Sequence, residues 1–175
     1  MEALVTALMV HQKSESLSSL EVLLERLSAN VSHAYTWQEV KQGLESDDPP
    51  YLVWTDVALA DGTWADVVDL ASGAPVPVNV IVVAGEPDVK LYLDVINRGG
   101  YDFVAPPFVL SDIAHIVRSA ALNVVSRRDS QARLISLLSP SPKGIPVQSA
   151  NPSSPVAQQT SASRQPQLIF QPAVD

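Results

Sequence analysis

Five apolar runs rich in β-branched residues alternate with five segments of helical periodicity, and this alternation restricts the chain to few folds. The apolar runs cover residues 4–10, 31–35, 51–56, 78–84 and 101–105, and the helical segments cover residues 16–29, 36–45, 63–71, 87–97 and 111 onward. Apolar runs of this length without regular polar alternation are typical of strands buried on both faces. Strict strand–helix alternation therefore predicts an α/β fold, with a parallel sheet covered by helices on both faces.

The end of the last helical segment is open to two interpretations. Neither Gly nor Pro interrupts the chain between Ser111 and Ser139, so the helix can continue through residues 128–138. The alternative is a terminal helix that frays after Ser126. An extended helix would expose Arg127, Arg128 and Arg133 to solvent and could pair with a second copy or a protein partner.

The composition changes at Ser139. Residues 139–175 are rich in Pro, Ser and Gln and hold half of the 14 prolines of the chain. Such a segment buries too little apolar surface to offset its ordering entropy, so we predict a disordered tail. The short cluster Leu168-Ile169-Phe170 is either a chance grouping or a linear motif that docks on a partner.

Charge and hydropathy exclude several classes of protein. The formal net charge is −8, which disfavours binding to the phosphates of nucleic acids. No apolar stretch approaches the roughly 20 residues that span a bilayer. The first residues lack the basic region and cleavage site of a secretory signal, and cysteine is absent. These features predict a cytoplasmic protein without membrane attachment.

Ligands of parallel α/β sheets bind beyond the carboxyl ends of the strands, so the residues at those ends are the candidate site. They include His11 and Gln12 after the first run, Asp56 at the end of the third, Ala84 after the fourth and Pro106 after the fifth. A search for a paired nucleophile and base among them finds none, which argues against an enzyme.

Three of these segments resemble the receiver domain of response regulators. Residues 54–62 are similar to its phosphoacceptor segment, residues 80–85 to its fourth strand and residues 101–108 to its fifth strand with the following Lys-Pro-Phe. The resemblance covers residues 3–127, and we take residues 1–127 as a receiver-like domain. It implies a flavodoxin-like sheet of strand order 2-1-3-4-5, with Asp56 as the phosphoacceptor candidate.

The same resemblance identifies departures from the family pattern. His11 and Gln12 replace two acidic residues that help to hold Mg²⁺, Ala84 replaces a Ser or Thr, and Pro106 replaces the Lys. Phe103 occupies the aromatic switch position without a phenol. Mg²⁺ prefers oxygen ligands that include carboxylates, and Asp56 is the only obvious carboxylate at these strand ends. We therefore expect no Mg²⁺ cofactor, and at most weak Mg²⁺ binding. We expect no other cofactor and no metal site, and we treat His11 and His33 as isolated residues at the rim.

These residues predict a degenerate receiver, or pseudo-receiver. The favoured function is an atypical response regulator in a bacterial phosphorelay, with weak or no phosphorylation at Asp56. It would act by contact with a protein, either a histidine kinase or a downstream signalling protein. The alternative is a phosphate-independent scaffold that recruits a partner, or dimerises, through its last helix or its tail.

Overall fold

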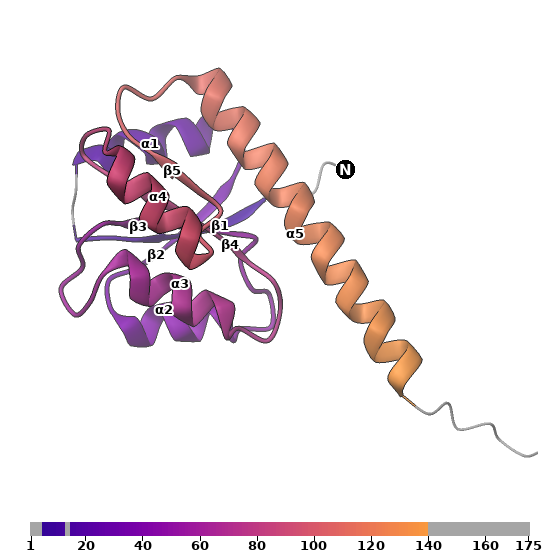
Figure 1. The fold of residues 1–175 in the computed structure, drawn as a ribbon. Coiled ribbons are helices and arrows are strands. Elements are labelled where there is room, and N and C mark those ends of the chain that lie inside the picture. The colour runs from indigo at the N-terminus through magenta and orange to yellow at the C-terminus, as the bar shows by residue number, and fades with distance from the viewer. Residues whose placement is uncertain (1–4, 13–14, 140–175) are drawn as a thin grey trace, which may run out of the picture. The chain divides into compact units, whose positions relative to one another are not determined.

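The computed structural model describes residues 5–12 and 15–139, and these residues form a five-stranded parallel sheet with helices on both faces (Figure 1). The strands are β1 (Thr6–Val10), β2 (Asn30–Ala34), β3 (Leu52–Asp56), β4 (Asn79–Val83) and β5 (Asp102–Val104). The helices are α1 (Glu15–Arg26), α2 (Trp37–Leu44), α3 (Trp64–Ser72), α4 (Val89–Arg98) and α5 (Leu110–Leu138). The strand order is β2-β1-β3-β4-β5, which confirms the predicted topology. The predicted disorder of the tail and the cluster Leu168-Ile169-Phe170 lie outside the described residues.

Two hydrophobic clusters fill the space between the sheet and its helices. Helices α1 and α5 cover one face, and the buried residues of that cluster are Ala7, Met9, Leu17, Leu20, Leu24, Leu52, Trp54, Ile81, Val83, Val104, Ile113, Val117 and Ala120. Helices α2 and α3 cover the other face, where they pack on Leu8, Val10, Val53 and Val80. The strands β1, β3 and β4 are therefore buried on both sides, as their continuous apolar sequences require.

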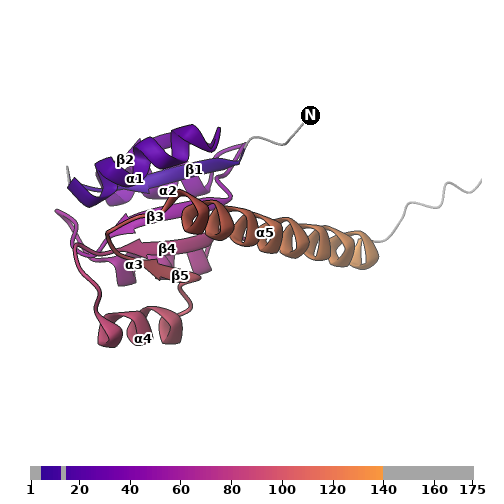
Figure 2. The same cartoon turned by 90° about the horizontal axis from the view of Figure 1, so that it is seen from above.

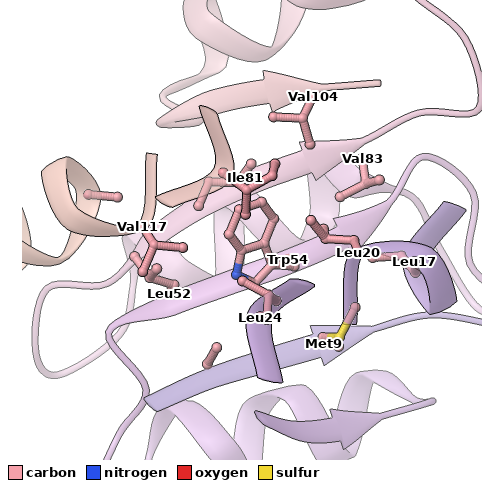
Figure 3. Packing of buried hydrophobic residues seen from close by; sticks show 13 residues of the cluster. Met9, Leu17, Leu20, Leu24, Leu52, Trp54, Ile81, Val83, Val104 and Val117 are labelled. Carbon is pink, nitrogen blue, oxygen red and sulfur yellow. The ribbon is translucent and has the colours of Figure 1, made fainter. Parts of the chain in front are cut away.

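Trp54 lies at the middle of the α1–α5 side of the core. Its side chain is fully buried, and Figure 3 shows its ring surrounded by Leu24, Leu52 and Ile81. Large aromatic side chains dominate core energetics because each buries a large apolar area.

The end of α1 and the start of α4 differ by two or more residues from the sequence-based prediction. Helix α1 begins at Glu15 and ends at Arg26, whereas we predicted residues 16–29. The difference at its end arises because Ser28 adopts a left-handed conformation, with φ of 58°, and the Ala29 N–H donates to the Leu24 carbonyl. This pattern closes a helix, so propagation stops before residue 29. Helix α4 begins at Val89, after the predicted start at residue 87.

Thr36 caps the N-terminus of α2. Its Oγ1 accepts a hydrogen bond from the Glu39 N–H at 3.3 Å, which satisfies one donor that has no partner within the helix. The Glu39 carboxylate accepts from the N–H of Tyr35, the residue before the cap, at 2.6 Å.

Helix α5 continues without interruption to Leu138 and projects beyond the sheet (Figures 1 and 2). It does not end near Ser126, and it begins at Leu110, one residue before the predicted start, with Val109 as its N-cap. We predicted that Arg127 and Arg128 face solvent. Arg127 is exposed as predicted, whereas Arg128 is half-buried, so for Arg128 the prediction is wrong. Both side chains bind the body of the domain: Arg127 donates to the Asn79 side chain, and Arg128 donates to loop carbonyls. These contacts extend the anchored part of the helix past Ser126.

No helix among the described residues is both long enough and apolar enough to cross a bilayer.

Candidate functional site

The strand-end residues selected from the sequence lie at one edge of the sheet. Asp56 is the last residue of β3 and pairs in register with Val83 of β4. His11 directly follows β1, and Ala84 directly follows β4. Pro106 lies two residues beyond the end of β5. Because all the strands are parallel, these positions share the carboxyl edge, which we call the Asp56 crevice.

Asp56 is half-buried, and its own backbone holds its carboxylate. The Val57 N–H donates to Asp56 Oδ1 at 2.9 Å. A carboxylate that accepts a backbone N–H is fixed in orientation at modest cost. Asp61, in the same loop, is engaged elsewhere, because its Oδ2 accepts from the Trp37 N–H at the start of α2 at 2.9 Å. The structure therefore does not pair Asp56 with Asp61.

The positions beside Asp56 on β4 and β5 provide few polar side-chain groups. Ala84 is buried, and its N–H donates to the Val104 carbonyl at 3.0 Å within the sheet. Pro106 has no N–H and joins Pro107 through a cis peptide bond. Phe103 lies inside β5 and meets Tyr92 of α4 edge to face, with ring centres 6.4 Å apart. On this side of the crevice, the side chains of these three residues offer neither a cation nor a hydroxyl group.

The β1 side of the crevice differs from the sequence-based expectation. We treated His11 and His33 as isolated rim residues, and this is wrong. His11 is only 7% exposed, and its Nε2 lies 3.1 Å from Nδ1 of His33 on β2. His33 Nε2 lies 3.0 Å from Glu21 Oε1 on α1. Tyr35 stacks on the His33 ring, with centres 6.3 Å apart.

If both rings are neutral, the order of the hydrogen bonds assigns their protons. A carboxylate can only accept, so Nε2 of His33 carries the proton that bonds to Glu21. Nδ1 of neutral His33 is then an acceptor, and Nε2 of His11 must donate to it across 3.1 Å. Glu21, His33 and His11 therefore form one directed chain from α1 through β2 to β1.

This environment disfavours a charge on His11. Burial lowers the pKa of His11 below its ordinary value of 6.5, and the neighbouring His33 lowers it further. The carboxylates of Glu21 and Asp56 act in the opposite direction and do not fully compensate. Near neutral pH, His11 is thus an uncharged residue beside Asp56.

The histidine pair could have been found from the sequence. The predicted order places the second strand beside the first, and parallel pairing brings residues near their carboxyl ends together. The observed register pairs Met9 with His33 and Val10 with Ala34, which places His33 within reach of His11. Glu21 carried no such signal, because the rotation of α1 about its axis is fixed only by packing.

The described residues contain no group of three or more His, Asp or Glu side chains arranged to hold a metal ion. Gln12, at the second position that carries an acid in the family pattern, is exposed. The site consists of one half-buried carboxylate, a buried neutral imidazole and mostly apolar surroundings.

Comparison with known proteins adds evidence from structure. No family model matches the sequence. No curated protein matches it either. Solved structures do match. The signal receiver domain of a protein described as a Luxo repressor from Vibrio parahaemolyticus is 24% identical, with a TM-score of 0.57 over 77% of this chain and 97% of that one.

Two further structures agree with this one. A CheY-like response regulator receiver domain protein from Methanospirillum hungatei is 19% identical, with a TM-score of 0.58 over 71% of this chain and 98% of that one. The beryllofluoride-activated NtrC4 receiver domain dimer is 26% identical, with a TM-score of 0.56 over 68% of this chain and 98% of that one. The chain folds as a receiver domain. The chain covers nearly the whole length of each of these three structures.

Proposed function

We propose that this receiver domain is an atypical response regulator in a phosphorelay-type bacterial pathway, with weak or no phosphorylation at Asp56. It acts in the cytoplasm by contact with a histidine kinase or a downstream signalling protein, and it is neither an enzyme nor a cofactor protein. The observation that carries this proposal is the set of neighbours of Asp56. A half-buried carboxylate occupies the end of β3, while His11, Ala84 and Pro106 occupy the adjacent strand ends.

The chemistry of phosphoryl transfer supports this view. Transfer to a carboxylate needs cations and hydrogen-bond donors that neutralise the charge on the phosphoryl oxygens. Ala84 provides no hydroxyl, Pro106 provides no ammonium, and His11 is neutral near pH 7 because burial lowers its pKa. Asp56 remains as an acceptor without these groups, so a slow or absent reaction is expected.

Beryllofluoride, which mimics an aspartyl phosphate, tests the proposal directly. Amide NMR spectra of the full chain are recorded with and without Mg²⁺ and beryllofluoride, for wild type and for Asp56→Ala. We expect no shifts that depend on Asp56 at millimolar ligand. Shifts centred on Asp56, Ala84 and Phe103, and absent from the variant, would contradict weak phosphorylation and indicate a working phosphate sensor.

A second candidate function is a phosphate-independent scaffold that binds through α5. The end of this helix exposes Leu134, Ile135, Leu137 and Leu138, which are between 58% and 83% exposed. A groove of about 690 Å³ also runs beside α5, and Val5, Leu27, Tyr51 and Leu122 contribute to its lining. Exposed apolar helix surfaces of this kind are used in helix-mediated association.

The oligomeric state distinguishes this second candidate. If α5 forms a homodimer, wild type elutes as a dimer in size-exclusion chromatography with light scattering, and the double variant L134S/L138S elutes as a monomer. Arg133→Ala is the matched control, because it changes an exposed residue of the same helical turn. A monomeric wild type would exclude the homodimer.

Capture of partners by wild type and by L134S/L138S separates the scaffold from the phosphate-dependent regulator. The scaffold loses its partner in the double variant and keeps it in Asp56→Ala. Capture that requires Asp56 and is unaffected by L134S/L138S would contradict the scaffold.

A further inference from the structure

We propose that Glu21, His33 and His11 form a proton-controlled switch that couples mild acidity to the β1 side of the Asp56 crevice. This inference goes beyond the proposed function and does not depend on phosphorylation of Asp56. It rests on the positions of three side chains from three different elements, α1, β2 and β1, joined by contacts of 3.0 Å and 3.1 Å.

The short distance between the two imidazoles limits the number of protons they can share. A hydrogen bond between Nε2 of His11 and Nδ1 of His33 requires one proton between the two nitrogens. If both rings become cations, each nitrogen carries a hydrogen, and two N–H groups face each other across 3.1 Å. The contact then changes from an attraction to a repulsion.

The first added proton can be accommodated, and the second cannot. With one added proton, the two rings still share a single proton between Nε2 of His11 and Nδ1 of His33, and the bond of His33 to Glu21 remains. The second proton would make both rings cationic, so it breaks the contact between His11 and His33. The pair therefore has a closed form with at most one charge and an open form with two.

The charged groups around the pair determine where His11 goes when the contact opens. Glu21 approaches from α1, His33 and the Tyr35 ring from the β2 side, and Asp56 from the end of β3. Both carboxylates attract a cationic His11, whereas His33 and burial oppose it. Glu21 already bonds to His33, so the carboxylate of Asp56 is the one that can attract a cationic His11. A charged imidazole is thereby drawn toward the crevice.

Burial and His33 place this transition on the acid side of neutrality. They lower the pKa of His11 below 6.5, so the closed form prevails at neutral pH and opens in mild acid. The open form gives the crevice the positive charge that Ala84 and Pro106 do not supply. It also moves the residue that connects β1 to the segment preceding α1.

Imidazole NMR of the full chain tests the switch. The chain has three histidines, so single His→Gln variants assign every ring signal. His115 is exposed on α5 and provides an internal reference in the same titration. We expect His11 to titrate at a lower pH than His115, and the amide signals of Asp56 and Val57 to shift with the same midpoint as His11.

Two variants separate the switch from a simple buried histidine. In His33→Gln, we expect the midpoint of His11 to rise toward that of His115, and the amide shift at Asp56 to move with it. His115→Gln is the matched control and should leave both midpoints unchanged. Because His33 lies at the sheet edge, its variant retains the fold, which circular dichroism checks.

Three results would overturn the proposal. The first is a wild-type His11 that titrates together with His115. The second is an Asp56 amide that does not follow His11. The third is a His11 midpoint that is unchanged in His33→Gln. None of these results bears on beryllofluoride binding, so the switch and the proposed function can fail separately.

Discussion

The guanidinium carbon of Arg128 lies 4.5 Å from the centre of the Tyr51 ring, and this contact anchors the middle of α5 to the loop before β3. The same guanidinium donates to the Pro50 carbonyl at 2.7 Å and to the Pro77 carbonyl at 2.9 Å. Burial lowers the pKa of Arg128, although the group remains charged at any physiological pH. Planar geometry allows one guanidinium to stack on a ring and to bond to several carbonyls at once.

Removal of this contact should destabilise the domain. We expect Arg128→Ala to lower the free energy of unfolding by about 1–3 kcal/mol, because carbonyls near the helix lose a charged donor. The stability of Arg128→Lys should lie between those of wild type and Arg128→Ala, since an ammonium cannot reproduce the several planar hydrogen bonds of the guanidinium. Arg133→Ala, five residues further along the exposed part of α5, should change the stability by less than about 0.5 kcal/mol. Urea denaturation measures all three, and equal effects of Arg128→Ala and Arg133→Ala would contradict the anchor.

Asn79 forms a second tie between the sheet and α5. It is 4% exposed, and its Nδ2 donates to the Ala120 carbonyl at 3.0 Å and to Asn123 Oδ1 at 3.1 Å. Its Oδ1 accepts from Arg127 at 3.0 Å. A buried amide whose hydrogen bonds are all satisfied is stabilising. Removal of one partner leaves the other polar group buried without a hydrogen bond, which lowers the stability.

A double-mutant cycle measures the energy that Asn79 and Arg127 share. We expect Asn79→Ala to cost about 1–3 kcal/mol and Arg127→Ala to cost less, because Arg127 is the more exposed partner. The coupling energy should be at least about 0.5 kcal/mol, as is usual for residues in direct contact. Purely additive effects in thermal or urea unfolding would show that the bond contributes nothing measurable.

The length of α5 shows what the sequence could and could not predict. The absence of Gly and Pro up to Ser139 allowed a long helix but did not require one. The requirement comes from Arg127 and Arg128, whose partners lie 48 to 79 residues away in the sequence. Helical periodicity detects the apolar contacts of Ile113 and Val117 with the sheet, and it carries no information about a charged side chain that binds distant carbonyls.

The candidate site divides in the same way. The alternation of strands and helices was sufficient to predict a parallel sheet and to place Asp56 and Ala84 at one edge, whereas the order of the strands came from the resemblance to receiver domains. The contact between His11 and His33 needed the register of two parallel strands, which strand order suggests but does not fix. The contribution of Glu21 needed the rotation of α1, which depends on the packing of Leu17, Leu20 and Leu24 and was not available from the pattern.

Leu24 offers a test of the core between α1 and the sheet. It is fully buried beside Trp54 in the α1–α5 cluster. We expect Leu24→Ala to lower the free energy of unfolding by about 2–5 kcal/mol, through lost burial and the cavity left beside the indole. Val22→Ala on the same helix is the control, because Val22 is 55% exposed and should change little. Chemical denaturation followed by tryptophan fluorescence measures both, and similar values for the two variants would contradict this packing.

The pH dependence of stability follows from the lowered pKa of His11. In the folded chain the pKa of His11 is lowered below 6.5, whereas in the unfolded chain it has its ordinary value. Between these two pKa values the unfolded state therefore binds more protons than the folded state. The stabilisation from neutral His11 is therefore complete above 6.5, declines as the pH falls toward the folded pKa, and stays constant below it. Carboxylates also titrate in acid, so the informative quantity is the difference in unfolding free energy between wild type and His11→Gln, measured by urea denaturation from about pH 8 to about pH 5. We expect the unfolding free energy of wild type to decrease relative to that of His11→Gln as the pH falls. A difference that does not change with pH would show that folding does not perturb the protonation of His11.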